Sequence, residues 1–552
     1  MKKNRSSLVL TLGAAALLLG GGLVAYSFLG FRTVKNVPLG TNVIPENTLV
    51  AVSISTNPEQ WRQLEPLGTP ESQVVWTQTI QQWRDQWLTK HGYDYQQDIQ
   101  PWIGEEAVIA FVPNPALLPE AERTTETPPI ETTDQSVIIV LPIANAAKAK
   151  ELLDQPKFLE QAKQRNYKGI EVQDLLGTDN QRYSLAVLGG KFVVIANHPR
   201  VLDWVIETYR GEPSLAQTPG YAEALTEIKS TAVLAQFYVN IPVAAAVTAA
   251  GSSRPIQAES LENLQQSQGI AATVSVVPDG LKIKGISWLK PNSQSTWIVD
   301  NSARTMGERF PDNTLMLISG GNLQRLWQDY VRGAEANPIA PFNPQQMRAE
   351  VKTSTDLDLE ADFLSWMAGE FALSLVPMPA AEKPNSRFAA SFVFMVKATD
   401  RRAAEDVLKK VDERFKQKNF RVTEEKINNQ SVVKWISPHG GYTVLRGWLD
   451  GNVVFVSLGA PVVDQFLPKP KTPLVVSETF KQTMPSDLNP NNGQFFLDVN
   501  RSFQSSSFSL PEFPPSQKVW IDAIDSIGIT TAIRTERTTR YEAFVRLKKI
   551  GE

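Results

Sequence analysis

One succession of motifs occurs twice along this chain. The run from Pro45 to Ser53, Pro-Glu-Asn-Thr and an apolar strand, recurs from Pro311 to Ser319 as Pro-Asp-Asn-Thr and another apolar strand. Paired aspartates, a tryptophan and a Gly-Glu step then follow in both halves: Asp94, Asp98, Trp102, Gly104, Glu105 and Asp358, Asp362, Trp366, Gly369, Glu370. Unrelated strands do not preserve such an order, and each copy is too long for a solenoid repeat. We therefore predict a tandem duplication.

The later part of each copy repeats as well. A strand leads to a helix whose predicted N-cap is a short polar residue, Asn145 or Asp400. A hairpin follows, with a two-residue turn at Gly189-Gly190 or Asp450-Gly451, where positive φ is needed. Some strands alternate apolar and polar residues and others are continuously apolar, which favours α+β domains with mostly antiparallel sheets covered by helices on one side.

The first residues predict a membrane anchor. Lys2, Lys3 and Arg5 precede an uncharged segment, and residues 8–31 are nearly all apolar or small. As a helix, those residues would span about 36 Å, enough for a hydrocarbon core of about 30 Å. A cleaved signal peptide is the alternative, but its apolar region is shorter and ends in a small-x-small site. The basic residues before the span favour a cytoplasmic N-terminus.

The expected fold class is therefore α+β: a single N-terminal transmembrane helix followed by two tandemly duplicated α+β domains with mostly antiparallel sheets. The expected divisions are a cytoplasmic tip and transmembrane anchor over 1–35, a linker over 36–44, a first repeat domain over 45–290, a linker over 291–304 and a second repeat domain over 305–550. The expected localisation is a single-pass protein of the inner, plasma or thylakoid membrane, with the body in the periplasm or thylakoid lumen.

Composition argues against several chemistries. The chain has no cysteine, which excludes disulfides, thiolate metal sites and cysteine nucleophiles. Its 55 basic and 58 acidic residues give a net charge of −3, unlike the basic surface of a nucleic-acid-binding protein. No nucleophile elbow, phosphate-binding loop or His-Glu-x-x-His motif occurs. We expect no enzymatic activity, no cofactor and no metal; a hydrolytic site would need polar groups around His91, His198 or His439.

Candidate interaction or structural positions come from two patterns. Trp76, Trp83 and Trp87 lie on one stripe of a helix that Thr69-Pro70 would begin. Such a stripe either docks a partner or membrane surface, or packs in the core, and we favour the core.

The second pattern pairs aspartates with a following tryptophan, Asp98 with Trp102 and Asp362 with Trp366. Paired carboxylates can act as an acid/base pair or hold calcium. No glycine stands where a calcium loop must turn, and an aspartate before a short helix caps that helix. We favour capping.

The chain resembles a known family at several points: the apolar N-terminal segment, Pro45-x-Asn-Thr, Gly68-Thr69-Pro70-Glu71 and Asp98-Ile-Gln-Pro-Trp-Ile-Gly104. This is the uncharacterised cyanobacterial family of N-terminally membrane-anchored proteins that carry a domain of unknown function. The resemblance covers the whole chain after the anchor. It implies a cyanobacterial source and a body in the thylakoid lumen or periplasm, and it brings no catalytic residues.

Two functions remain open. The first is a non-enzymatic scaffold or assembly factor that is held to the membrane by residues 8–31 and binds a protein of a membrane complex. The alternative is a binding protein for a small apolar or lipid-like ligand, in a cleft within or between the two halves; a pocket of about 300–1,000 Å³ would favour it.

Overall fold

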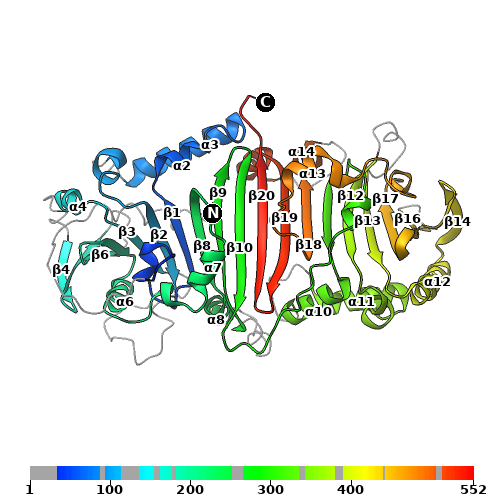
Figure 1. Ribbon diagram of the computed structural model, residues 1–552, viewed down its shortest axis with the longest axis horizontal. Coiled ribbons are helices and arrows are strands. Elements are labelled where there is room, and N and C mark those ends of the chain that lie inside the picture. Colours follow the sequence, from blue (N-terminus) through cyan, green and yellow to red (C-terminus); the bar gives the residue numbers. More distant parts are fainter. Residues whose placement is uncertain are drawn as a thin grey trace.

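The computed structural model describes residues 34–87, 94–113, 136–153, 162–176, 182–251, 265–334, 342–378, 389–438, 442–504 and 513–551. Its strands form one antiparallel sheet of 20 strands (Figure 1). The strands are β1 Val50–Ser55, β2 Glu106–Val112, β3 Ser136–Pro142, β4 Ala162–Tyr167, β5 Ile170–Leu176, β6 Arg182–Leu188, β7 Phe192–Ala196, β8 Val233–Asn240, β9 Ser267–Val277, β10 Gly280–Leu289, β11 Met316–Gly320, β12 Phe371–Pro377, β13 Ala390–Lys397, β14 Arg421–Ile427, β15 Gln430–Ile436, β16 Thr443–Leu449, β17 Val453–Gly459, β18 Gly493–Asp498, β19 Ile524–Thr535 and β20 Thr538–Leu547.

The order of hydrogen-bonded strands is the same on both sides of the molecule. From one end it runs β4-β5-β6-β7-β3-β2-β1-β8-β9-β10, and from the other β14-β15-β16-β17-β13-β12-β11-β18-β19-β20. The two series meet where β10 pairs with β20, from Gly280 opposite Arg546 to Trp288 opposite Thr538. We call this pairing the junction. At its middle Lys284 lies opposite Glu542.

The predicted fold class of a transmembrane helix followed by two separate α+β domains is wrong, because both halves contribute to one sheet. The physical reason concerns the strand at the edge of each half's sheet. An exposed edge strand presents unpaired N–H and C=O groups, and joining β10 to β20 along their length satisfies both edges at once. The predicted boundaries of the two repeat domains, 45–290 and 305–550, stay a prediction.

The predicted anchor over residues 8–31 lies outside the described residues. Among the described helices, none is both long and apolar enough to cross a bilayer.

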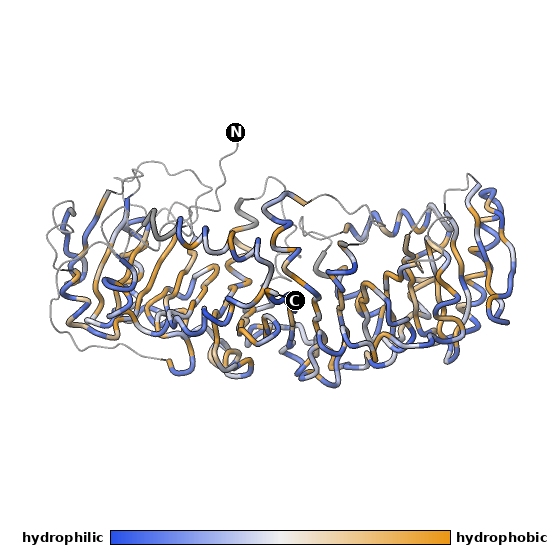
Figure 2. Tube along the Cα trace, turned by 90° about the horizontal axis from the view of Figure 1, so that it is seen from above, coloured by the Kyte–Doolittle hydropathy of each residue, from blue (hydrophilic) through white to orange (hydrophobic). Residues whose placement is uncertain are grey.

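Helices lie on both faces of the sheet. They are α2 Pro58–Arg62, α3 Pro70–Trp87, α4 Ala146–Leu153, α6 Pro199–Tyr209, α7 Tyr221–Glu227, α8 Ile241–Gly251, α10 Leu323–Ala334, α11 Pro344–Thr355, α12 Arg401–Gln417, α13 Glu478–Thr483, α14 Val499–Gln504 and α15 Pro515–Asp522. Figure 1 shows α2 and α3 along one edge of the first half, and α10 and α11 along the opposite edge of the second. Seen from above, the molecule is elongated and its apolar strands run through the interior (Figure 2).

Alternate residues of the central strands define two faces. On the packed face, Val108 and Tyr238 join a core beneath α6 and α7, and Leu317 and Phe496 join a second core with α13. On the opposite face, two further cores lie toward the ends of the sheet. There α4 packs over Trp102, and α12 packs over Trp366. The helices therefore cover both faces rather than the one side expected from sequence.

One glycine pair and one cap illustrate how local sequence sets these elements. Gly189 and Gly190 have φ of 56° and 65° at the tight turn between β6 and β7, a conformation that glycine adopts without strain. The Asp400 side chain accepts a hydrogen bond from the N–H of Ala403 and begins α12, whose buried face carries Val407, Leu408 and Val411.

The junction contains a buried carboxylate with an unusual environment. Glu542 is 1% exposed and its two oxygens have no hydrogen-bond partner; its only ion pair among the described residues is with Arg540, at 3.5 Å. Burial raises the pKa of Glu542, Asp487 raises it further, and Lys282, Lys284 and Arg540 act in the opposite direction. The folded protein therefore holds this proton more tightly than the unfolded chain, so stability falls as pH rises above the ordinary glutamate pKa of about 4.3.

We expect Glu542→Gln to raise the free energy of unfolding at neutral pH. The gain over wild type should be absent below about pH 4, where both states are protonated, and should grow as pH rises through the pKa of Glu542. Urea unfolding of both proteins across this pH range measures it, with Glu424→Gln on exposed β14 as the control. A less stable Glu542→Gln at pH 7 would mean that attraction to the three cations outweighs burial.

Candidate functional site

The middle of the sheet leaves apolar side chains partly exposed on the face opposite the packed face. Five of them are 38–46% exposed; we call them the open face, and they are Phe237 40%, Ile270 41%, Ile318 38%, Phe392 46% and Leu458 42%. They share one side of the sheet because the register places them there. Phe392 lies beside Leu458 and opposite Leu375, and Leu375 lies opposite Met316. Phe237 lies opposite Ala272, which shares its side of β9 with Ile270.

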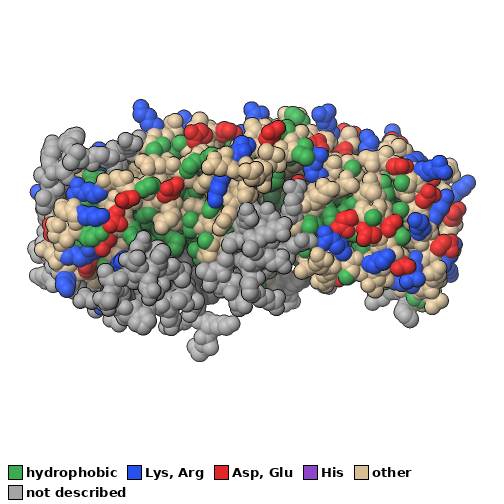
Figure 3. All heavy atoms as spheres, turned by 90° about the horizontal axis from the view of Figure 1, so that it is seen from below, with side chains coloured by type: hydrophobic (Ala, Val, Ile, Leu, Met, Phe, Trp, Pro, Cys, Tyr) green, Lys and Arg blue, Asp and Glu red, His purple; other side chains and the backbone are tan. Residues whose placement is uncertain are grey.

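Some strands of the open face are apolar on both sides. In β13, for example, Val393 and Met395 enter the packed core, while Phe392 and Phe394 point the other way. An antiparallel sheet with one wet face alternates apolar and polar residues. An apolar patch that such a sheet leaves exposed commonly marks an interaction surface. Figure 3 shows patches of apolar side chains along the molecule seen from below, and charged side chains along its rim and at both ends.

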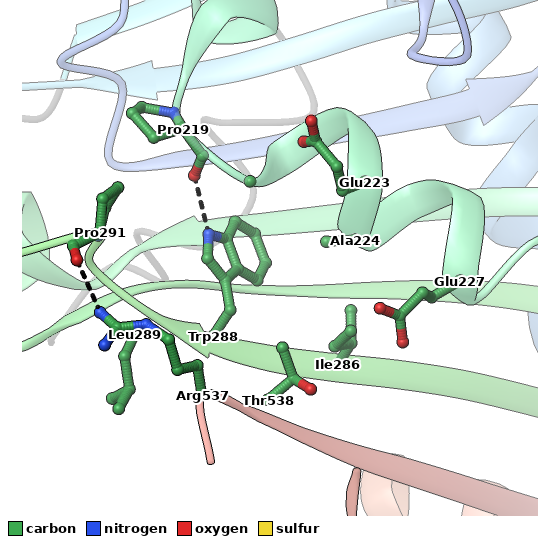
Figure 4. A pocket seen from close by; sticks show the side chains of 11 residues that line it. Pro219, Glu223, Ala224, Glu227, Ile286, Trp288, Leu289, Pro291, Arg537 and Thr538 are labelled. Carbon is green, nitrogen blue, oxygen red and sulfur yellow. Dashed lines mark hydrogen bonds between the residues drawn. The ribbon is translucent and has the colours of Figure 1, made fainter. Parts of the chain in front are cut away.

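A small pocket lies on the packed face, at one end of the junction (Figure 4). Trp288 of β10 forms its floor and donates a hydrogen bond from Nε1 to the Pro219 carbonyl, at 2.9 Å. Gly220 lies directly against the indole, since a Cβ there would be 2.7 Å from Nε1. Glu223 and Glu227 of α7 stand at the rim, and Arg537 donates to the Pro291 carbonyl at 3.0 Å.

The volume of this Trp288 pocket is about 220 Å³. That is below the range of roughly 300–1,000 Å³ typical of ligand sites. A larger cleft of about 790 Å³ lies in the first half, and polar and apolar residues line it in about equal measure, with Ser53, Gln236 and Glu105 among the polar ones and Ile103, Ile143 and Leu234 among the apolar ones. The volume of the larger cleft lies in the range expected for a ligand site, but half of its wall is polar. The expected small apolar ligand stays a prediction.

Both predicted aspartate–tryptophan pairs lie at short helices that lead into a strand. Asp94 accepts hydrogen bonds from the N–H groups of Gln96 and Gln97, and Asp98 accepts one from the N–H of Asp94 at 2.8 Å. In the second half, Asp358 accepts from Ala361 and Asp362 accepts from Asp358. These reciprocal bonds satisfy the free N–H groups at each helix start.

Trp102 and Trp366 are each 1% exposed, in the cores beneath α4 and α12. The Trp102 Nε1 donates to the Asp98 carbonyl at 2.8 Å, whereas the Trp366 Nε1 is buried without a partner. Both side chains therefore contribute to packing.

The predicted tryptophan stripe is described only in part. Trp76 is half-buried in α3 and stacks on Trp61 of α2, with ring centroids 6.0 Å apart and an interplanar angle of 18°. The side chains of Trp83 and Trp87 lie outside those the structure describes. Whether this stripe contacts a partner stays a prediction.

The histidines form no visible catalytic group within the described chain. His198 caps α6 by accepting the Arg200 N–H on Nδ1, at 3.2 Å. Burial lowers the pKa of His198, and Arg200 and Arg182 lower it further. His91 and His439 lie outside the described residues. Among the described side chains, no three His, Asp or Glu gather in a way that could hold a metal ion.

The open face is the feature that the sequence analysis missed. Its signal was present in the continuously apolar strands of the second half, such as Phe-Val-Phe-Met over 392–395. Apolar residues at consecutive positions predict a strand buried on both sides. They do not say whether the chain itself covers both sides.

Of the comparisons with known proteins, only the match to a family model identifies a relationship. A family model described as "Protein of unknown function (DUF3352)" matches residues 11–547. No curated protein matches. Solved structures described as crystal forms I, III and IV of TP0453 align with TM-scores of 0.24, 0.23 and 0.25 and identities of 7%, 7% and 6%. These alignments cover 47%, 47% and 46% of this chain and 81%, 82% and 81% of those chains. TM-scores this low say nothing about the fold or role of this chain.

Proposed function

Because this chain belongs to the DUF3352 family, whose function is unknown, its role has to be argued from its own geometry, and we propose that it is a non-enzymatic interaction protein. Its partner is a protein of a membrane complex, and the open face is the docking surface. The observation that supports this is the exposure of large apolar side chains on one side of the joined sheet, from Phe237 in the first half to Leu458 in the second.

The continuity of the sheet supports a large contact. Between Phe237 and Ile318 the same side carries Ile283 of β10, Ala543 of β20 and Ile529 of β19, which lie opposite one another across the junction. None of these three is exposed as fully as Phe392, but none is charged. A partner that covers the middle of the sheet would therefore bury few charges, as the core of a stable interface requires.

We expect Phe392→Thr combined with Leu458→Thr to weaken partner binding with little loss of stability. Threonine retains β propensity, and both side chains are already 42–46% exposed, so the cost to folding should be about 1 kcal/mol or less. Ile298→Thr is the matched control, because Ile298 is 61% exposed and lies outside the sheet, between β10 and β11.

The measurement is site-specific photo-crosslinking in native membranes, with the reactive residue at 392, 458 or 298. One discrete product from 392 and 458 that is absent from 298 is the expected result. With the reactive residue at 392, Leu458→Thr should reduce this product, and with the reactive residue at 458, Phe392→Thr should reduce it. The same product from all three positions, or none from the open face, would contradict the proposed function.

The compartment is a separate proposal, because it rests on residues 1–33 outside the described chain. We propose that the body lies in the periplasm or thylakoid lumen. Since the chain has no cysteine, Thr423→Cys on exposed β14 gives a single label site. A membrane-impermeant maleimide should label it from the extracytoplasmic side only, and protection until the cytoplasm is opened would contradict the proposal.

A further inference from the structure

The two halves differ at one cleft, and the difference points to a ligand. Each half begins with a short 3-10 helix, Leu39–Asn42 or Met306–Arg309. The first backbone N–H of each donates to a glutamate at the start of a strand, Leu39 to Glu106, the first residue of β2, at 2.5 Å, and Met306 to Glu370, the residue before β12, at 3.0 Å. The helices and glutamates therefore occupy equivalent places, so the chain before each helix can be compared directly.

In the second half, the preceding segment lies along the sheet. The Ala303 N–H donates to the Asn491 carbonyl at 3.1 Å in an antiparallel bridge just before β18. Asn301 bonds both backbone groups of Ile533, at 3.0 and 2.9 Å. Ser302 packs against Gly321, where a Cβ would lie 2.4 Å from its Oγ. Residues 301–303 thus fill the space beside the first residues of β18.

In the first half, the chain takes another path. Asn36 has a φ of 64°, and the Val34 N–H donates to the Asn42 side chain at 2.7 Å, so residues 34–37 turn back onto their own 3-10 helix. The corresponding space beside β8 is the cleft of about 790 Å³, and Val233 to Gln236 line it. This volume lies within the range of ligand sites.

The charges of the residues that line the cleft indicate the charge of its ligand. The second half anchors its segment by an ion pair of Asp300 with Arg325, at 3.0 Å. Arg325 lies three residues after Asn322, whose side chain caps its helix. In the first half, the residue three after the helix cap Asn57 is Gln60, which is neutral and lines the cleft. The strand registers make Glu106 equivalent to Glu370, so Gly369 corresponds to Glu105 and not, as the sequence repeat suggested, to Gly104. Glu105 is exposed in the cleft wall, and no Lys or Arg is among the described lining residues.

We propose that this cleft binds an extended, basic peptide segment of a partner protein, in the way that the second half holds residues 301–303 of its own chain. Backbone hydrogen bonds to the start of β8 would supply affinity, as in strand addition, and Glu105 would supply the preference for a cation. This inference does not depend on the open face, which lies on the other side of the sheet from Ser53, Gln236 and Glu106.

The test uses the full chain and two fluorescent heptapeptides in an anisotropy titration. One copies residues 300–306, Asp-Asn-Ser-Ala-Arg-Thr-Met, and the other has lysine in place of the aspartate. The lysine peptide should bind about three- to tenfold more tightly, the size expected when an exposed like-charge contact becomes an attractive one.

Three protein variants decide where the peptides bind. Glu105→Lys should abolish or reverse the preference for lysine, and Ala144→Trp, at an exposed lining position, should weaken both peptides at least about tenfold by filling the cleft. Glu424→Lys makes the same charge change on distant β14 and should leave both affinities within about twofold. No saturable binding of either peptide, or binding that Ala144→Trp leaves unchanged, would overturn the proposal.

Discussion

Replacing Trp102 or Trp366 with alanine is expected to lower the free energy of unfolding by about 3–5 kcal/mol, because each indole is fully buried in a core and alanine leaves a cavity. The phenylalanine variants should separate the two sites. Trp102→Phe also breaks the hydrogen bond to the Asp98 carbonyl, whereas Trp366→Phe removes an N–H that has no partner. We expect Trp102→Phe to cost about 1–2 kcal/mol more than Trp366→Phe.

Urea unfolding followed by far-UV circular dichroism measures these losses. Trp520→Ala is the control, since Trp520 is 43% exposed, and it should change stability by no more than about 0.5 kcal/mol. Equal losses for the two phenylalanine variants would show that the hydrogen bond of Trp102 contributes nothing beyond packing. A small loss for both alanine variants would contradict the placement of these tryptophans in the cores.

The second large effect is expected at the junction. Gly280 begins β10 with a φ of 151°, and a Cβ there would lie 2.1 Å from the Val545 carbonyl oxygen of β20. Gly280→Ala therefore combines an unfavourable backbone conformation with a collision that only a shift of one strand can relieve. We expect a loss of about 2–4 kcal/mol, together with faster hydrogen exchange of the N–H groups that join β10 to β20.

Gly211→Ala is the matched control for this prediction. Gly211 also has a positive φ, 126°, but nothing lies within 4 Å of its would-be Cβ. Its substitution should cost about 1–2 kcal/mol and leave exchange at the junction unchanged. Equal losses at both positions would mean that backbone conformation alone accounts for the effect and that β20 does not press on Gly280.

Most local elements could be predicted because their determinants are close in sequence. The Asp400 cap, the Gly189-Gly190 turn and the repeated Pro-x-Asn-Thr strand starts all depend on side chains within a few residues of the structure they set. The aspartates of the two short helices belong to the same class, since each bonds an N–H two to four residues away. Such signals persist in sequence whatever the tertiary arrangement.

The candidate sites could not be predicted in this way. The exposure of Phe392 depends on what covers its side of the sheet, and its sequence context is that of a strand buried on both sides. The first-half cleft exists because residues 34–37 turn away from β8, whereas residues 301–303 stay beside β18. The sequence motifs around the two 3-10 helices are similar, so they do not predict that the segments before them take different paths.

By itself, the amino-acid order determined that one succession of strands, caps and turns would be built twice. Only the tertiary structure decided that the two series would share a single sheet. The last strand of each copy can either stay unpaired at the edge of its own sheet or pair with the last strand of the other copy. Pairing along the whole of β10 and β20 places Lys284 opposite Glu542, residues more than two hundred positions apart. No local pattern encodes that choice, because the hydrogen bonds that make it come from backbone groups that every strand carries.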